Sequence, residues 1–316
     1  MVFVLFFLYL IRMKTSDKLW GIDLGGTKIE CAVLDTKHQV ITRKRIPTEA
    51  ANGYPHIISQ VKRLVDEVSN DLGEYPSCIG FGTPGVVDPA MGVMKNCNTV
   101  VMNGQPMHVD LERATGVPVR LANDANCFAL AETLMGAGKD HPDARVVFGI
   151  IMGTGVGGGL VVHGKIIEGL HGIGGEWGHN ILEEGGDPCY CGKQGCVEKV
   201  ISGPGLEHYY QRISNKKIKL KDILQHHLDG SDEHATATIE RLLENYGRAV
   251  STLINVLDPD LIVIGGGVGN IDLLYTDGYE RIKKYVFNNK RLTTPIKKPA
   301  LGDSAGVFGA ALLWED

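Results

Sequence analysis

The sequence predicts an α/β protein made of two similar halves, because one strand-turn-strand pattern occurs twice. Residues 19–34 read as an apolar strand, the glycine turn DLGGTK and a second apolar strand. Residues 146–169 repeat this layout, with the strand VVFGIIM, the turn GTGVGGG and the strand LVVHG. Self-similarity of this kind indicates an internal duplication. We therefore expect two α/β domains, each of which opens with a glycine hairpin.

Length and composition agree with two ordinary domains and disfavour several classes of protein. The chain has 316 residues, 43% of them hydrophobic, with a net charge of −5 and a pI near 6.1. Basic residues form only short pairs such as Lys216-Lys217, so we expect no nucleic acid partner. Of seven cysteines, three cluster at 189–196 and four stand singly. This usage favours a reducing cytoplasm over a disulfide framework.

The beginning of the chain departs from this composition. The run MVFVLFFLYLI is apolar, but it is shorter than the ~20 residues that span a bilayer. It also has no leading positive region and no cleavage site of small residues. We interpret residues 1–13 as an extra apolar tail rather than an anchor, and expect Met13 to be the natural initiation site.

The first half contains two candidate ligand-binding turns. A strand at 39–47 completes an antiparallel meander after the first hairpin, and 54–72 has the apolar period of a helix. A short strand then ends in Thr83-Pro84-Gly85, a turn of small residues that leaves room for a ligand. The strand VPVRLA leads into Asn123-Asp124, a strand-to-helix junction of the kind that points side chains into a crevice. The alternative role for Asp124 is a helix N-cap.

The second half contains a glycine pattern that could be mistaken for a dinucleotide site. Gly153, Gly155 and Gly158 match G-x-G-x-x-G, but that fingerprint requires a helix after the glycines. Here LVVHGKII alternates and turns like a hairpin, so we reject the dinucleotide interpretation. Two such hairpins that face each other would clasp the phosphates of one nucleotide.

Further elements complete the second half. We expect helices at 204–213, 220–228 and 236–256, the last amphipathic along its length. The strand LIVIGGGV ends in Gly265-Gly266-Gly267, where bare backbone would let a flat base lie close. A helix of small residues at 302–316 would pack back on the earlier domain.

The segment 172–198 carries a metal-site pattern. It is rich in glycine, poor in apolar residues, and contains His179, Cys189, Cys191 and Cys196. One histidine with three cysteines is a common closed set of ligands for structural zinc. We therefore predict that zinc holds this loop and fixes two flanking carboxylates, Glu176 and Glu198. The alternative is a loop with free thiols and solvated carboxylates.

Six motifs, in order, resemble those of the ROK family of sugar kinases and repressors. They are DLGGTK at 23–28, NDAN at 123–126, GTGVGGG at 153–159, GEWGH at 175–179, CYCGKQGC at 189–196 and GGG at 265–267. The resemblance covers nearly everything after Met13. Segments such as KNCNTVVMNGQP, EWGHN and CYCGKQGC look most like the bacterial fructokinase (manno(fructo)kinase) branch. The N-acetylglucosamine kinase branch is next, through NDANCFAL and GTGVGGG.

The resemblance implies an actin-like, ribonuclease-H-like pair of domains with a cleft between them. It suggests a small domain of 14–121 plus 303–316, and a large domain of 122–302 that contains the zinc. The expected partners are ATP with Mg²⁺ and a hexose, most simply fructose, with mannose and glucose possible and N-acetylglucosamine as the alternative. A homodimer is also expected. In this kinase, Asp124 would be the base that accepts the proton of the 6-hydroxyl.

The resemblance also assigns the other site residues. Asp23 would be the carboxylate on the magnesium side, and the other ATP and phosphate contacts would be Gly25, Gly26, Thr27, Lys28, Gly153, Thr154, Gly155, Val156, Gly157, Gly158, Gly265, Gly266 and Gly267. Sugar contacts would be Asn98, Asn123, Glu176, His179 and Glu198, with Thr83, Pro84 and Gly85 lining the same pocket. Zinc would lock the sugar-side loop without touching phosphate.

Two other classes of function are weighed and disfavoured. Repressors of this family carry a helix-turn-helix module before the first hairpin, whereas here only a short apolar tail precedes Asp23. A sugar-binding protein without catalysis is disfavoured because Asp124 and both glycine hairpins are present.

Overall fold

The computed structural model describes residues 14–315, which form two compact units. Unit 1 contains the described residues up to Ala131, together with 168–174 and the chain from Asp303. Unit 2 contains 132–167 and 175–302. Residues 122–131, which the sequence analysis assigned to the second domain, thus cluster with the first. The proposed tail at 1–13 and the start at Met13 lie outside the described residues.

Unit 1 is built on a five-stranded sheet with the order β4-β3-β2-β6-β9. Strands β2 (Leu19–Leu24), β3 (Lys28–Leu34) and β4 (Val40–Pro47) form an antiparallel meander. Strands β6 (Ile79–Thr83) and β9 (Val119–Asn123) extend it in parallel. Two short pairs lie outside this sheet: β1 (Lys14–Ser16) with β5 (Glu74–Pro76), and β7 (Val86–Val87) with β8 (Met94–Lys95).

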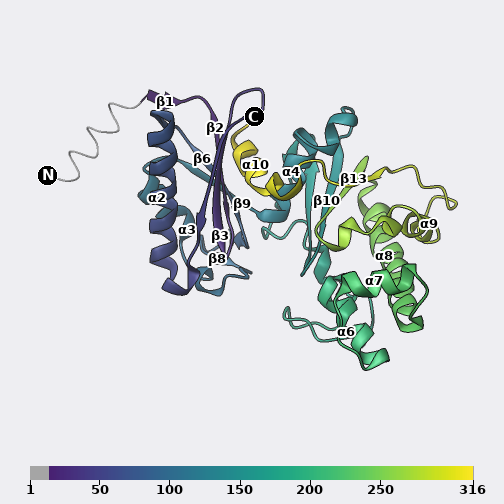
Figure 1. Cartoon of the computed structure of the whole chain (residues 1–316). Helices are drawn as coiled ribbons and strands as arrows, with labels where there is room; N and C mark the ends of the chain where they lie inside the picture. Colours follow the sequence, from purple (N-terminus) through teal and green to yellow (C-terminus); the bar gives the residue numbers. More distant parts are fainter. Residues whose placement is uncertain (1–13, 316) are drawn as a thin grey trace. The chain divides into compact units, whose positions relative to one another are not determined.

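Helices cover both faces of this sheet (Figure 1). Helices α2 (Tyr54–Leu72) and α3 (Met107–Thr115) lie on one face, and α10 (Ala305–Ala311) lies on the other. The contact with α10 is close, because a Cβ atom at Gly80 would lie only 1.8 Å from the Ala310 carbonyl oxygen. The C-terminal helix therefore packs back on the first sheet, as the small residues predicted.

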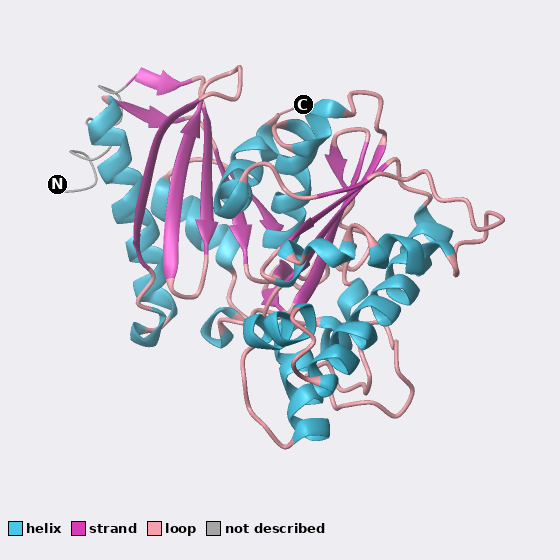
Figure 2. Cartoon of the chain, turned by 45° about the vertical axis from the view of Figure 1, so that its right-hand side comes forward, coloured by secondary structure: helices cyan, strands magenta, loops and turns pink. Residues whose placement is uncertain are grey.

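Unit 2 repeats the sheet with the order β12-β11-β10-β13-β14. Strands β10 (Val146–Met152), β11 (Val156–Val162) and β12 (Lys165–Ile166) are antiparallel, while β13 (Leu261–Gly265) and β14 (Ile296–Lys297) are parallel additions. The element that follows the second glycine turn is the strand β11, and Figure 2 shows all strands of the chain in magenta. The absence of a helix at this point in the described chain agrees with the rejection of a dinucleotide fingerprint.

The helices of unit 2 enclose its core. They are α5 (Val197–Ile201), α6 (Gly203–Ser214), α7 (Leu220–Leu228), α8 (Glu233–Leu257) and α9 (Asp277–Lys283). Helix α8 has a defined start and end: the Asp232 carboxylate accepts hydrogen bonds from two first-turn amides, and Asp258 adopts a left-handed conformation with φ 44°. Its buried stripe packs with Phe148, Ile262 and Ile264 of the sheet.

Helix α4 (Asp124–Leu134) starts directly after β9, and the chain first passes from unit 1 to unit 2 within it, at Ala131–Glu132. The strand-to-helix junction predicted at Asn123-Asp124 is therefore present. In the described part of the chain, no helix is both long and apolar enough to cross a bilayer.

Candidate functional site

The first hairpin presents unbonded backbone amides beside a carboxylate. Within the turn, the Gly25 amide donates to the Lys28 carbonyl oxygen at 3.0 Å. The hydroxyl of buried Thr48 stabilises the turn by donating a hydrogen bond to the Gly25 carbonyl oxygen at 2.6 Å. Among the described residues, the amides of Gly26 and Thr27 have no hydrogen-bond partner. The turn therefore keeps donors available for an anion.

Asp23 stands at the end of β2, below this turn. Burial raises the pKa of its carboxyl, and the nearby Lys28 ammonium partly opposes that rise. Glycines leave room around the carboxylate: a Cβ atom at Gly306 would lie 3.4 Å from Oδ2, and one at Gly82 would lie 3.7 Å from Oδ1. Asp23 is thus a carboxylate held in a low-dielectric position with glycine neighbours.

Asp124 follows β9 and is exposed, as expected for a group that acts on a ligand. The Ala125 amide lies 2.9 Å from Asn123 Oδ1 and 2.8 Å from Asp124 Oδ1. Asn123 therefore shares the helix-capping role that was the alternative for Asp124. Both Asp23 and Asp124 act with burial to raise the pKa of the buried Cys127 thiol. Both carboxylates therefore act electrostatically on the same buried thiol of unit 1.

The turn after β6 has mainly structural contacts. Thr83 is buried, and its hydroxyl lies within hydrogen-bonding distance of the carbonyl oxygens of Gly85 (2.9 Å) and Ala122 (3.2 Å). A Cβ atom at Gly85 would lie 2.5 Å from the Lys95 carbonyl oxygen. The predicted substrate residues Thr83 and Gly85 thus also shape the backbone, and the Asn98 amide joins them by donating to the Pro84 carbonyl oxygen at 3.4 Å.

The second hairpin differs from the first in its support. The Gly153 amide donates to the Gly155 carbonyl oxygen at 2.9 Å, and the described chain offers no partner to the amides of Thr154 and Gly155. The Val156 amide donates to Glu198 Oε2 at 3.1 Å. One oxygen of Glu198, a predicted sugar contact, is therefore engaged by the hairpin itself.

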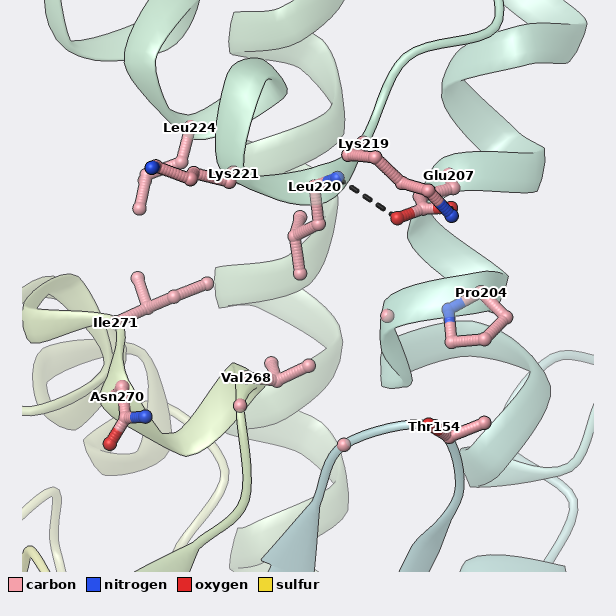
Figure 3. A pocket seen from close by; sticks show the side chains of 13 residues that line it. Thr154, Pro204, Glu207, Lys219, Leu220, Lys221, Leu224, Val268, Asn270 and Ile271 are labelled. Atoms are coloured by element: carbon pink, nitrogen blue, oxygen red, sulfur yellow. Dashed lines mark hydrogen bonds and ion pairs between the residues drawn. The ribbon is translucent and has the colours of Figure 1, made fainter.

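A cavity of about 620 Å³ lies against this hairpin, wholly within unit 2. Figure 3 shows side chains of Leu220, Val268 and Ile271 on one side of it, and those of Thr154 and Pro204 on another. Its full lining is Gly153, Thr154, Gly203, Pro204, Glu207, Lys219, Leu220, Lys221, Leu224, Gly267, Val268, Asn270 and Ile271.

The sequence analysis found only the glycine-turn part of this lining. It singled out Gly153, Thr154 and Gly267, but missed the residues contributed by α6 and α7 and by the turn after β13. Those residues come from helical segments in which nothing local in the sequence indicates a binding site, except the Gly203-Pro204 start of α6. Conversely, Val156, Gly157 and Gly158 were expected to contact phosphate and do not line the cavity.

The three consecutive glycines after β13 have different roles. Gly266 has φ +84°, and a Cβ atom there would lie 2.3 Å from the Met152 carbonyl oxygen. Gly267 lies in the cavity wall with no neighbour within 4 Å of a built Cβ. Gly265 closes β13. Only Gly267 of the three therefore fits the expectation that bare backbone lets a base approach.

The zinc pattern converges in space. The candidate ligand atoms of His179, Cys189, Cys191 and Cys196 all lie within 4.8 Å of one another. Cys189 Sγ is 3.5 Å from His179 Nδ1, and Cys191 Sγ is 3.6 Å from Cys196 Sγ. A tetrahedral zinc with Zn–S bonds of ~2.3 Å separates two sulfurs by ~3.8 Å. The spacing and donor chemistry fit zinc.

The second nitrogen of His179 has a partner that the sequence analysis did not anticipate. If Nδ1 binds zinc, Nε2 is the nitrogen left for the predicted sugar contact, and it lies 3.0 Å from the Tyr190 hydroxyl oxygen. The two rings also meet edge to face, with centroids 5.1 Å apart. A zinc ligand is commonly oriented by such an outer hydrogen bond, so Tyr190 positions this histidine.

The loop before the cluster is anchored to β11. Trp177 donates from Nε1 to the Gly157 carbonyl oxygen at 3.0 Å, and its ring packs against Phe148 and the bare Gly158. This gives Gly157 and Gly158 a packing role. Burial raises the pKa of Glu176, the residue before Trp177, and Glu198 raises it further against the opposing effect of His179. Glu176 and Glu198 therefore lie close enough to repel each other.

Comparison with known proteins identifies the class. The family model described as ROK family matches residues 19–316, and the chain belongs to this family. An N-acetyl-D-glucosamine kinase of Yersinia pseudotuberculosis serotype O:3 is 38% identical over 304 residues, covering 93% of this chain and 98% of the relative.

Solved structures agree in fold. The ROK hexokinase of Thermus thermophilus has a TM-score of 0.84 and 31% identity, covering 94% of this chain and 97% of that one. A ROK family glucokinase of Streptomyces griseus, solved with glucose and AMPPNP, has a TM-score of 0.75 and 27% identity, with coverage of 94% and 98%. The fold is thus the duplicated, actin-like two-domain ATPase fold that the resemblance implied.

Proposed function

We propose that the protein is an ATP-dependent sugar kinase that phosphorylates the 6-hydroxyl of a hexose. The observation that carries this proposal is the cavity of unit 2, which combines apolar walls with a glycine turn whose amides are unbonded. Its volume, about 620 Å³, lies in the range of ~300–1,000 Å³ typical of sites for ligands of nucleotide size. Adenosine would pack against Leu220, Val268 and Ile271, and the phosphates would meet the amides of Thr154 and Gly155.

Unit 1 supplies the groups for phosphoryl transfer. Asp124 is exposed, carries an acceptor oxygen and stands at the start of a helix, so it suits the role of base. Asp23 offers oxygen ligands of the kind that Mg²⁺ prefers, next to the unbonded amides of the first hairpin. Bound Mg²⁺ would neutralise charge on the β- and γ-phosphates. The remaining predicted contacts at Asn98, Glu176, His179 and Glu198 stay predictions.

Zinc fits the Cys₃His cluster as a structural ion. His179, Cys189, Cys191 and Cys196 would supply all four ligands, which leaves no open position for catalysis. When bound, zinc supplies cross-links that a loop without an apolar core lacks. The cluster would then hold Glu176 and Glu198 at the ends of one rigid segment.

Between the sugars, N-acetylglucosamine is the substrate that the relatives support best. Enterobacterial relatives named N-acetyl-D-glucosamine kinase are 35–38% identical over 93% of this chain. Fructose, the first expectation from the sequence, is supported only by the likeness of segments such as CYCGKQGC to the fructokinase branch. We therefore place fructose second.

A substrate panel tests this proposal. ADP release would be measured with ATP and Mg²⁺ for N-acetylglucosamine, N-acetylmannosamine, glucose, mannose and fructose, and compared as kcat/KM. A value for N-acetylglucosamine at least tenfold above that for fructose is the expected result, and the reverse order supports fructose. No sugar-dependent ADP release from zinc-loaded protein would contradict the kinase proposal. The expected homodimer stays a prediction, which light scattering tests.

A further inference from the structure

A second, much smaller cavity lies in unit 1 beside the proposed base. It is lined by residues of β6, β7, β9, α4 and the loop 168–174: Thr83, Val86, Val87, Leu121, Ala122, Asn123, Asn126, Glu168 and Gly172. Its volume is about 40 Å³, and each water needs ~10–15 Å³. The cavity therefore accepts about three non-hydrogen atoms, which is enough for a hydroxymethyl group and too little for an acetamido group.

Asn126 gives this cavity an unsatisfied acceptor. The residue is 3% exposed, and its Oδ1 atom is shut off from solvent with no hydrogen-bond partner in the described chain. A buried polar atom without a partner loses the hydrogen bonds that it makes to water in the unfolded chain, so native structures rarely keep one without a reason. A hydroxyl that enters the cavity can donate to this oxygen.

Glu168 adds a second acceptor to the lining, from a segment distant in sequence. It begins a short loop that closes on itself, because the Gly174 amide donates to the Glu168 carbonyl oxygen at 2.7 Å. The loop rests on unit 1, where a Cβ atom at Gly172 would lie 3.1 Å from the Val87 carbonyl oxygen. Glu168 itself is exposed to solvent, although desolvation by its surroundings raises the pKa of its carboxyl.

We propose that Asn126 and Glu168 form a hydroxyl-binding subsite that selects the sugar, with one substrate hydroxyl donating to this pair of acceptors. The proposal rests on the proposed function, and it deepens that function by adding a specificity site. Asn123 and Thr83 line both this cavity and the predicted sugar site, so a sugar held at Asp124 would have a hydroxyl within reach. The neutral, donor-bearing chemistry of a hydroxyl suits two acceptor oxygens and a volume of this size.

The first test removes the acceptor on the loop. Glu168→Leu should raise the KM for the preferred sugar about tenfold or more, because hydrogen bonds to charged groups contribute strongly to recognition. The KM for ATP and the Tm should stay near wild type. Asp143→Asn is the control and should leave the sugar KM unchanged, because Asp143 is an exposed carboxylate that lines another cavity, in unit 2. An unchanged sugar KM in Glu168→Leu would overturn the proposal.

Substrate analogues sharpen this test. In the wild type, one monodeoxy analogue of the preferred sugar should lose about tenfold in kcat/KM relative to the parent, and in Glu168→Leu that analogue should lose nothing further. Equal losses in wild type and variant for every analogue would mean that Glu168 meets no sugar hydroxyl.

A buried variant separates binding from a merely structural role. Asn126→Leu removes the unpaired oxygen at similar size. If the cavity holds only water, this change should keep or raise the Tm and leave the sugar KM unchanged, which contradicts the subsite. A higher sugar KM at an unchanged Tm supports it.

Calorimetric titration of each protein with the sugar alone keeps the two proposals apart. Sugar binding without ADP release would contradict the proposed kinase activity. The sugar affinities of the variants would still test the subsite. A wild type that binds no sugar would overturn the subsite itself.

Discussion

The two units share one sheet topology but hold their glycine hairpins in different ways. In unit 1 the turn at Gly25 is held by the buried hydroxyl of Thr48 and stands beside the Asp23 carboxylate. In unit 2 the turn at Gly153 is held by helix α6, whose Gly203 amide donates to the Gly153 carbonyl oxygen at 2.9 Å. Duplication thus reproduced the backbone, while side chains made one hairpin part of a charged site and the other the wall of a cavity.

This contrast shows that two copies of one fold can carry different kinds of site, one with ionisable groups and one with an apolar cavity. Unit 1 carries the ionisable groups Asp23 and Asp124, whereas unit 2 carries an apolar cavity and a cysteine cluster. We therefore expect loss of the Asp124 carboxylate in unit 1 to lower turnover, and changes at the large cavity or the cysteine cluster of unit 2 to lower affinity or stability. Four experiments can break or sharpen that division.

The largest effect is expected from Asp124→Ala in unit 1. Loss of a general base typically lowers kcat by about 10²–10⁴-fold. The Tm should change little, because Asp124 is exposed and Asn123 still accepts from the Ala125 amide. Steady-state kinetics with thermal denaturation checks both parts, and Asp140→Ala, at an exposed position of unit 2, is the control. Turnover near that of the wild type would remove Asp124 from the mechanism.

The next effect is expected from loss of the metal in unit 2. Cys196→Ser should lower the zinc content, the Tm and sugar affinity, since Cys196 is fully buried among the candidate ligands. Affinity for ATP should fall less, because the cavity lining contains none of these ligands. Elemental analysis and calorimetric titration are the measurements, with Cys78→Ser as a thiol control outside the cluster. Equal losses of sugar and ATP affinity would argue that zinc supports the whole unit rather than the loop.

Substitutions at Gly266 and Gly267 in unit 2 distinguish an effect of backbone strain from an effect on ligand contact. Gly266→Ala should lower the free energy of unfolding by about 1–3 kcal/mol, the usual cost of a left-handed residue other than glycine, and its Cβ atom would also lie 2.3 Å from the Met152 carbonyl oxygen.

Gly267→Ala is the matched variant, with space around the new Cβ atom. It should change stability by less than about 0.5 kcal/mol but raise the KM for ATP. Denaturant unfolding and ATP titration distinguish the two variants. If Gly267→Ala binds ATP normally, the proposed position of the nucleotide is wrong.

The smallest effect concerns the stability of unit 1 as a function of pH. Burial raises the pKa of Asp23 above 3.8. Lys28 and Arg45 oppose this rise, and Glu30 adds to it. The folded state therefore holds the proton more tightly than the unfolded state, and this carboxyl destabilises the fold as the pH rises from 3.8 through its folded pKa.

Asp23→Asn should consequently raise the Tm slightly at pH 7, with a gain that closes as the pH falls below 3.8. Thermal scans across this range provide the measurement. A Tm for Asp23→Asn below that of the wild type at pH 7 would show that the charged carboxylate is stabilised by its neighbours.

Parts of the site could be read from the sequence because they depend on local pattern. The Cys₃His set lies within eighteen residues in the chain, and the glycine turns carry their own conformational signal. Other parts had no such signal. Asn126 looks like any first-turn polar residue, and only the structure shows that its side-chain oxygen is buried without a partner and that it lines a cavity with Glu168 and Gly172 from elsewhere in the chain.

By itself the sequence determined the duplicated strand order, the glycine turns and the Cys₃His set of candidate metal ligands, because these follow from short-range periodicity, backbone freedom and donor chemistry. Only the tertiary structure decided that Leu220 and Ile271 line one cavity. It also decided that the Tyr190 hydroxyl lies within hydrogen-bonding distance of His179, and that a Glu198 oxygen accepts a hydrogen bond from the second hairpin. Those contacts join segments that are distant in sequence or lie on irregular loops. Their geometry arises from packing, which no local pattern encodes.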